Sequence, residues 1–160
     1  MQATIATHNA FWFQGYPSRW GQERQQGHPD VLQGLIRLYE ELSPDVLCLQ
    51  EVPEDDSFAE LAKQLGMRGH YAPGGIIAAY GGAILARHLE IDLNGCSAAA
   101  ASSGSHFERS CISTRIKVGD SHLKLVSVHL SGNRLKYLDQ IDPVHLASER
   151  YASGRQGEPC

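Results

Sequence analysis

The chain has 160 residues, 42% of them hydrophobic, and a formal net charge of −4. This length allows one domain with a buried core, which we place over residues 1–160. Without a run of basic residues, strong non-specific binding to nucleic acid or to an anionic membrane is not indicated. No stretch reaches the roughly 20 apolar residues of a membrane span, and the N-terminus lacks a signal-peptide pattern. We therefore expect a cytoplasmic protein without a transmembrane segment. The four cysteines form no CxxC pair, which favours free thiols over a zinc site or a disulfide framework.

The first third of the chain predicts a strand, a helix and a second strand. Alternating small and β-branched residues, ending in aromatics, indicate a strand over residues 3–13, and glycines and a proline mark a loop after it. Apolar residues at helical spacing predict a helix over residues 29–42, which Pro44 prevents from continuing. The run over residues 46–49 is apolar on both faces, as is typical of a central strand covered on both sides.

The rest of the chain predicts a short helix and then strands. A capping-box spacing of Ser57 and Glu60 opens a helix that Gly66 would end. Short strands are predicted at residues 70–71, 76–80 and 83–87, separated by Gly-Gly turns, and a small polar loop at 97–106 precedes a hairpin of 111–118 with 123–130. This order predicts an α/β fold, a mixed β-sheet sandwich with flanking helices.

Two polar residues stand at the ends of the first two long strands. Glu51 ends an otherwise apolar strand, where a carboxylate is costly to leave dry and unpaired. Asn9 lies near the C-terminal end of the first strand, and the helix between the two strands predicts that they are parallel neighbours whose ends share the edge at which ligands bind. Glu51 suits Mg²⁺, which often takes one or two protein carboxylates. The alternative interpretation is a surface carboxylate and a turn-forming amide.

One histidine is also a candidate for chemistry. His129 interrupts an apolar strand just before a loop, where it would either stabilise charge on a phosphoryl group or transfer a proton. A structural role is the alternative. His8 has less claim, because alternation along the strand directs it to the face opposite Asn9.

Four segments together resemble the endonuclease/exonuclease/phosphatase superfamily of DNase I-like metal-dependent phosphoesterases. They are Ala-Thr-His-Asn at 6–9, Pro-Asp-Val-Leu-Cys-Leu-Gln-Glu-Val at 44–52, Gly-Ala-Ile-Leu-Ala-Arg at 82–87 and Val-Ser-Val-His-Leu at 126–130. They occur in the family's order and approximate spacing.

The resemblance implies a Mg²⁺-dependent hydrolase of phosphoesters, with Mn²⁺ as an alternative metal. In it, Glu51 would bind the metal, and Asn9 would be a phosphate- or metal-site amide. His129 would contact the scissile phosphate, and Arg109 and Tyr80 would line the substrate site. The substrate class stays open among nucleic acid, lipid headgroups and inositol phosphates.

The chain also departs from the family pattern. The Gly-Asp-x-Asn and Ser-Asp-His motifs of the family's second half do not occur, and residues 148–156 resemble the start of its crossover helix. We therefore expect the N-terminal half of such a domain, whose hydrolysis would need a C-terminal half. The alternative is a catalytically inactive fragment or a half-domain that associates with another chain. An uncovered apolar sheet face would favour self-association.

Overall fold

The computed structural model describes residues 2–15, 27–54, 56–92, 97–98, 107 and 109–130. No helix in these ranges is long and apolar enough to cross a membrane. The helices are α1 (Pro29–Leu42), α2 (Ser57–Gln64) and a short 3-10 helix, η1 (Phe11–Phe13). The strands are β1 (Ile5–Asn9), β2 (Val46–Val52), β3 (Arg68–Ala72), β4 (Gly81–Ala86), β5 (Glu90–Ile91), β6 (Ser97–Ala98), β7 (Cys111–Val118) and β8 (Ser121–Val128).

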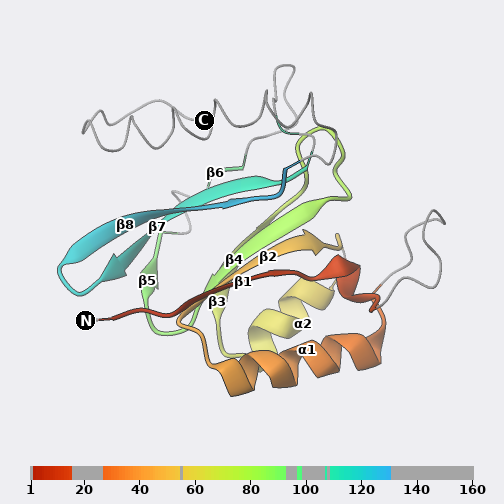
Figure 1. The fold of residues 1–160 in the computed structure, drawn as a ribbon, viewed down its shortest axis with the longest axis horizontal. Coiled ribbons are helices and arrows are strands. Elements are labelled where there is room, and N and C mark those ends of the chain that lie inside the picture. The colour runs from red at the N-terminus through yellow and green to blue at the C-terminus, as the bar shows by residue number, and fades with distance from the viewer. Residues whose placement is uncertain are drawn as a thin grey trace.

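Two β-sheets and a helical layer make up the described fold (Figure 1). The first sheet has the order β1-β2-β4-β3, with β1 parallel to β2 and the other pairs antiparallel. In the second sheet, β7 pairs antiparallel with β5, β6 and β8. Helices α1 and α2 cover one face of the first sheet, and the second sheet packs on its other face (Figure 1). The predicted fold class, a mixed α/β sandwich, is confirmed.

The first sheet is buried on both faces because its central strands are apolar on both. Leu47 and Leu49 of β2 belong to a core shared with α1 and α2. Cys48, between them, faces the opposite way and packs in a second core with isoleucines of β4 and β7. The alternation along β2 therefore assigns each side chain to one of two cores.

Several boundaries agree with the sequence. Helix α1 has Pro29 in its first turn and ends at Leu42, and its C-cap residue Ser43 has a left-handed φ of 44°. The hairpin of β7 and β8 has the predicted turn, and Gly119 there takes a φ of 62°. Gly66 follows α2 with a φ of 61°, as expected of a helix stop.

Three local predictions are wrong. Residues 11–13 form the helix η1 instead of continuing the strand, since the Phe13 N–H donates to the Ala10 carbonyl. Residues 76–80 form turns instead of a strand, because the Gly74 N–H donates to the Ala78 carbonyl within the same loop. Helix α2 begins at Ser57 and has Asp56 at its N-cap, whose side chain makes no cap hydrogen bond, so Ser57 is not the N-cap residue that the predicted capping box requires.

One of the predicted Gly-Gly turns is part of a strand instead. Gly81 and Gly82 lie inside β4 and do not form a turn. A Cβ at Gly81 would lie 2.7 Å from the carbonyl oxygen of Val52, so glycine permits this close strand approach. Cys48 and Cys111 are thiols outside any disulfide, as predicted. Residues 97–98, predicted as the start of the loop 97–106, form β6 instead. The rest of that loop up to residue 106, the crossover-like segment 148–156 and the other two cysteines lie outside the described residues.

Candidate active site

A β-bulge presents Glu51. The pairing of β2 with β4 shifts register between Gln50 and Val52, which leaves Glu51 as the extra residue. Its backbone has a φ of 53°, in the left-handed region that non-glycine residues adopt at a cost. Bulges of this kind redirect a side chain relative to the regular alternation.

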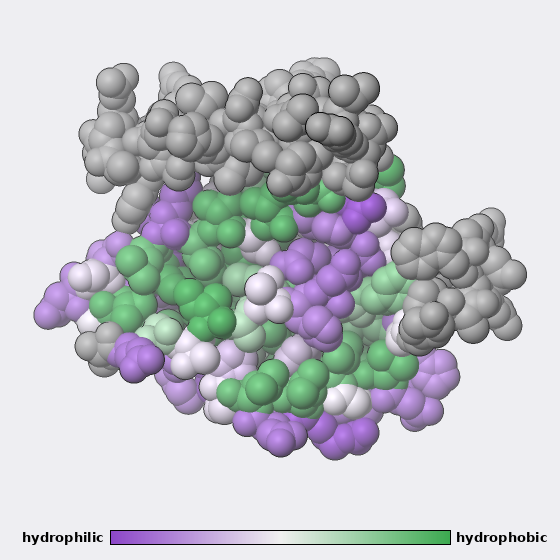
Figure 2. All heavy atoms as spheres, viewed as in Figure 1, coloured by the Kyte–Doolittle hydropathy of each residue, from purple (hydrophilic) through white to green (hydrophobic). Residues whose placement is uncertain are grey.

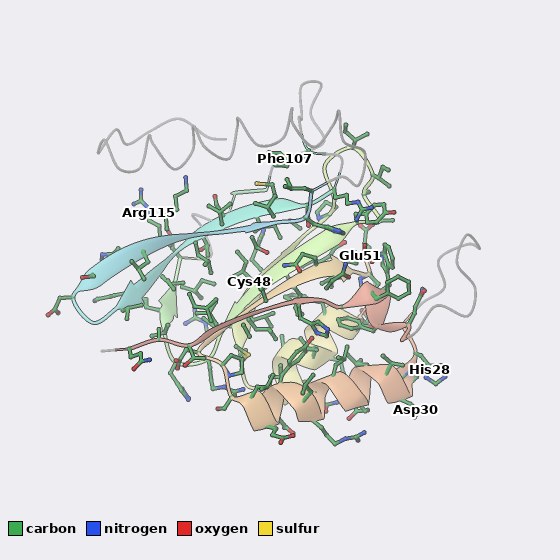
Figure 3. All side chains as sticks on the ribbon, in the orientation of Figure 1. His28, Asp30, Cys48, Glu51, Phe107 and Arg115 are labelled. Carbon is green, nitrogen blue, oxygen red and sulfur yellow. The ribbon has the colours of Figure 1, made fainter. Side chains whose placement is uncertain are left out.

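The redirection decides which layer the carboxylate faces. Leu49 and Val52 both pack in the core on the helical side, whereas Gln50 reaches the second sheet, where its Nε2 donates to Ser127 Oγ at 3.2 Å. Strict alternation would send Glu51 to the helical side with Leu49. Instead, its carboxylate contacts Arg109 and His129 on the side of the second sheet. In Figure 3, Glu51 lies near the end of β2 and Cys48 lies farther back along the strand.

The β7–β8 hairpin brings Arg109 and His129 together. Cys111 pairs with Val128, and beyond that pair the His129 N–H donates to the Ser110 carbonyl at 2.8 Å. Arg109 therefore lies diagonally across from His129, although 20 residues separate them along the chain. The Arg109 carbonyl in turn accepts from the Gly75 N–H at 2.7 Å, which fixes its backbone against the β3–β4 loop.

Glu51, Arg109 and His129 form one contact cluster. Glu51 Oε1 lies 3.5 Å from Arg109 Nη1 and 3.5 Å from His129 Nε2. The Glu51 side chain is 7% exposed, that of His129 14% and that of Arg109 23%. Removing one partner of such a buried pair would leave the other charge uncompensated, which is strongly destabilising. The more exposed Arg109 is the member of the cluster that a ligand can reach most easily.

The contact between Arg109 and His129 fixes the tautomer of the imidazole. Arg109 Nη1 is hydrogen-bonded to His129 Nε2. Because a guanidinium has donors and no acceptor, Nε2 must accept, which places the imidazole proton on Nδ1. Nδ1 is buried and has no hydrogen-bond partner among the described residues. Burial, and then the charge of Arg109, lower the pKa of His129 to about 4. His129 is therefore neutral near pH 7.

Aromatic rings support the cluster from one side. The Arg109 guanidinium lies over the Tyr80 ring, 4.3 Å from its centroid, a cation–π contact. The same ring meets the His129 ring edge-on at 5.8 Å between centroids. Trp12 packs against Tyr80 at 5.2 Å and its Nε1 donates to the Ala79 carbonyl at 2.6 Å. The structure thus places Tyr80 in the cluster.

Asn9 lies at the same end of the sheet, but its side chain is hydrogen-bonded to the backbone of its own turn. It pairs with Gln50 in the β1–β2 register, and its Oδ1 accepts from the Phe11 N–H at 3.0 Å. Its exposed side chain is thus one strand away from Glu51, in the turn-forming role that we gave as the alternative. His8 points to the helical side, where its Nδ1 lies 2.6 Å from the Tyr39 hydroxyl, as alternation predicts.

The donor set decides which metal fits. Across the described ranges, no three His, Cys, Asp or Glu side chains gather as a multi-ligand metal site would require. Mg²⁺ is often held by one or two carboxylates and completes its shell with water and phosphate oxygens. Glu51 supplies one such buried carboxylate, with Asn9 on the neighbouring strand. These residues fit a Mg²⁺ or Mn²⁺ ion held mainly by Glu51, and they do not fit a zinc site.

Sequence reasoning missed two parts of this region. Trp12 is predicted only as part of the aromatic end of the first strand, but its burial and its packing on Tyr80 make it the support of the site. Gln50 links the two sheets, since its Nε2 donates to both Thr7 Oγ1 at 3.0 Å and Ser127 Oγ. The polar pair Gln50-Glu51 after an apolar run is the sequence signal for both residues, but it predicts a functional role only for Glu51 and not the link that Gln50 makes between the sheets.

These layers and strand order are the DNase I-like fold of the endonuclease/exonuclease/phosphatase proteins. Solved structures show the likeness, whereas no protein-family model matches the sequence and no curated protein is significantly similar to it.

Three solved structures illustrate the match. An endonuclease/exonuclease/phosphatase family protein from Bacteroides thetaiotaomicron has a TM-score of 0.71 at 14% identity, over 96% of this chain and 59% of its own. Truncated Caenorhabditis elegans TDP2 has a TM-score of 0.65 at 16% identity, over 94% and 55%. ANGEL2, a 2′,3′-cyclic phosphatase, has a TM-score of 0.58 at 18% identity, over 85% and 45%. The chain spans about half the length of these structures, and the likeness establishes its fold.

Proposed function

We propose that this chain carries one half of a metal-dependent phosphoesterase site, with Glu51 as the metal ligand. The observation that carries the proposal is the meeting of Glu51, Arg109 and His129 at one end of the two sheets. Glu51 and Arg109 are 58 residues apart, and a bulge turns the carboxylate toward the other two. A carboxylate, a guanidinium and an imidazole are the groups that phosphoester hydrolysis uses.

Each side chain has a role that follows from its chemistry. A divalent metal at Glu51, when bound, would neutralise charge that develops on the phosphate. Arg109 would donate N–H bonds to phosphate oxygens, for which its planar fork is suited. His129, neutral and buried, would lie beside the phosphate, and its Nε2 would accept a hydrogen bond from a water or a protonated phosphate oxygen once Arg109 no longer donates to that nitrogen. Asn9 would position a phosphate oxygen or a water.

The solved structures with this fold guide the choice of substrate. One is Danio rerio TDP2 in complex with a single-strand DNA product, and ANGEL2 was solved with adenosine-2′,3′-vanadate. They support phosphate esters of nucleotides and nucleic acids as the first substrates to test. Phospholipid headgroups and inositol phosphates belong in the same panel, because the described residues select the phosphate and not the group attached to it.

The experiment compares the chain with a form extended past residue 160, each with Mg²⁺, Mn²⁺ or EDTA, on bis(p-nitrophenyl) phosphate and then on the substrate panel. We expect metal-dependent hydrolysis that Glu51→Gln lowers by about 100-fold or more, the scale on which one transition-state charge contact acts. Glu90→Gln is the matched control, since Glu90 is an exposed carboxylate paired with Lys117 at 3.7 Å. An inert extended protein, or equal rates for Glu51→Gln and wild type, would refute the proposal.

A second candidate is a half-domain that associates with another chain. Among the described strands, β1 and β8 each lie at one edge of a sheet, and each exposes a large apolar side chain, Ile5 at 47% and Leu123 at 46%. Figure 2 shows hydrophobic side chains over both strands. Unpaired strand edges with apolar residues favour association. Size-exclusion chromatography and thermal melting test this candidate: a cooperatively folded monomer at all concentrations contradicts it.

A further inference from the structure

Arg109 contacts one carboxylate oxygen of Glu51, the residue that we propose as the metal ligand. Its Nη1 lies 3.5 Å from Glu51 Oε1, and His129 Nε2 lies at the same distance from that atom. The Glu51 carboxylate is almost covered, whereas Arg109 is the most exposed of the three side chains. A divalent cation on this carboxylate would stand within a few ångströms of the guanidinium, and like charges this close repel strongly in a partly buried site.

The surroundings of Arg109 allow it to move without losing all support. Its guanidinium lies on the face of Tyr80, and Trp12 holds that ring in turn. Its backbone is held by the bond from the Gly75 N–H. A guanidinium stacked on a ring keeps a favourable contact while its N–H groups turn from one anion to another. A phosphate group beside the cluster would offer such an anion, and it would satisfy several N–H groups at once.

We propose that Arg109 and the metal compete for the Glu51 carboxylate, and that a bound phosphate group draws Arg109 away from it. In the free protein Arg109 takes the place of the metal; when the phosphate of a ligand binds, Arg109 turns to it and leaves Glu51 to the metal. Metal and phosphate therefore bind cooperatively, and by linkage each raises the affinity for the other by the same factor. This inference rests on the proposed function, because it takes Glu51 as the metal ligand.

The experiment measures metal affinity directly, without catalysis. Free Mn²⁺ is followed by electron paramagnetic resonance during titration of the full chain, with and without inorganic phosphate, after correction for Mn²⁺ bound by phosphate alone. In wild type we expect phosphate to tighten Mn²⁺ binding about 10-fold, within the usual range of coupling between sites. Arg109→Gln should bind Mn²⁺ about 10-fold more tightly than wild type without phosphate, and phosphate should then change its affinity less than about 2-fold.

Two further variants complete the design. Arg115→Gln removes the same charge from an exposed position on β7 and should keep the wild-type affinity and coupling. Glu51→Gln should abolish tight Mn²⁺ binding in both conditions. If Arg109→Gln does not fold, as judged by circular dichroism, the wild-type titration alone still tests the coupling.

The outcomes separate the two proposals. If wild type binds Mn²⁺ through Glu51 equally well with and without phosphate, the competition is overturned and the metal site stands. If Arg109→Gln binds Mn²⁺ no more tightly than wild type, the competition is likewise overturned. If no protein binds Mn²⁺ in either condition, or if Glu51→Gln binds it as wild type does, the metal role of Glu51 fails and this inference fails with it.

Discussion

Replacing His129 by glutamine should change how the stability of the protein depends on pH. Burial and the neighbouring Arg109 lower the pKa of His129 from 6.5 to about 4 in the folded protein. The unfolded chain takes up this proton below its ordinary pKa, whereas the folded protein resists it. His129 therefore supports the folded state above pH 6.5, and this contribution is lost as the pH falls toward 4.

The size of the effect follows from the two pKa values. Between about pH 7.5 and about pH 5, the difference in proton uptake at His129 lowers the free energy of unfolding by about 2 kcal/mol. This is a sizeable share of the 5–15 kcal/mol or so that holds a typical domain together. His129→Gln removes the titrating group, so the variant should lose this part of the acid destabilisation.

Urea unfolding at these two pH values measures the effect in wild type and variant. His122→Gln is the control for replacing a histidine, since His122 is exposed and lies on β8, the strand that ends just before His129. An NMR titration of the His129 ring then gives its pKa directly. A His129 pKa at or above 6.5 would refute the reasoning, because Glu51 would then outweigh burial and Arg109. So would an unchanged pH dependence in His129→Gln.

Three further predictions concern packing and the thiols. Gly81→Ala should cost about 1–3 kcal/mol in urea unfolding, because the added Cβ meets the Val52 carbonyl, which cannot move without shifting β2. Gly34→Ala in α1, where a Cβ would have no neighbour within 4 Å, should instead stabilise by up to about 1 kcal/mol; a loss of stability there would contradict the account of α1. Burial raises the pKa of Cys48 to about 11, so peptide mapping after brief iodoacetamide treatment at about pH 8 should find Cys111 alkylated well before Cys48.

Much of the fold could be predicted because its signals are local. Helix α1 has a proline at its start, apolar residues at helical spacing and a proline just after its end. The β7–β8 hairpin has alternation on both sides of Gly119. Residues 76–80 were mispredicted because two isoleucines and a tyrosine have high strand propensity. Their backbone groups bond within the loop and to the carbonyl of Phe107, which no local pattern reveals.

The candidate site could be predicted only in part, because part of it depends on contacts between residues far apart in the sequence. Asn9 and Glu51 stand at the ends of parallel neighbouring strands, and such an edge can be inferred from strand order. The contact of Arg109 with His129 depends on the hairpin register continuing one pair past Cys111. That register follows from the turn, but the direction in which a long side chain then reaches does not.

The bulge at Glu51 is the feature that no sequence pattern could supply, and it bears most directly on function. A left-handed backbone at a non-glycine residue costs about 1–3 kcal/mol, and glycine would adopt it at little cost. A regular strand would instead direct this side chain into the core between the first sheet and the helices, where an unpaired carboxylate is still more costly. The chain carries glutamate at the strained position, and the strain turns its carboxylate toward Arg109 and His129. The backbone strain at position 51 is therefore best explained by a functional role of the Glu51 carboxylate in its contact with Arg109 and His129.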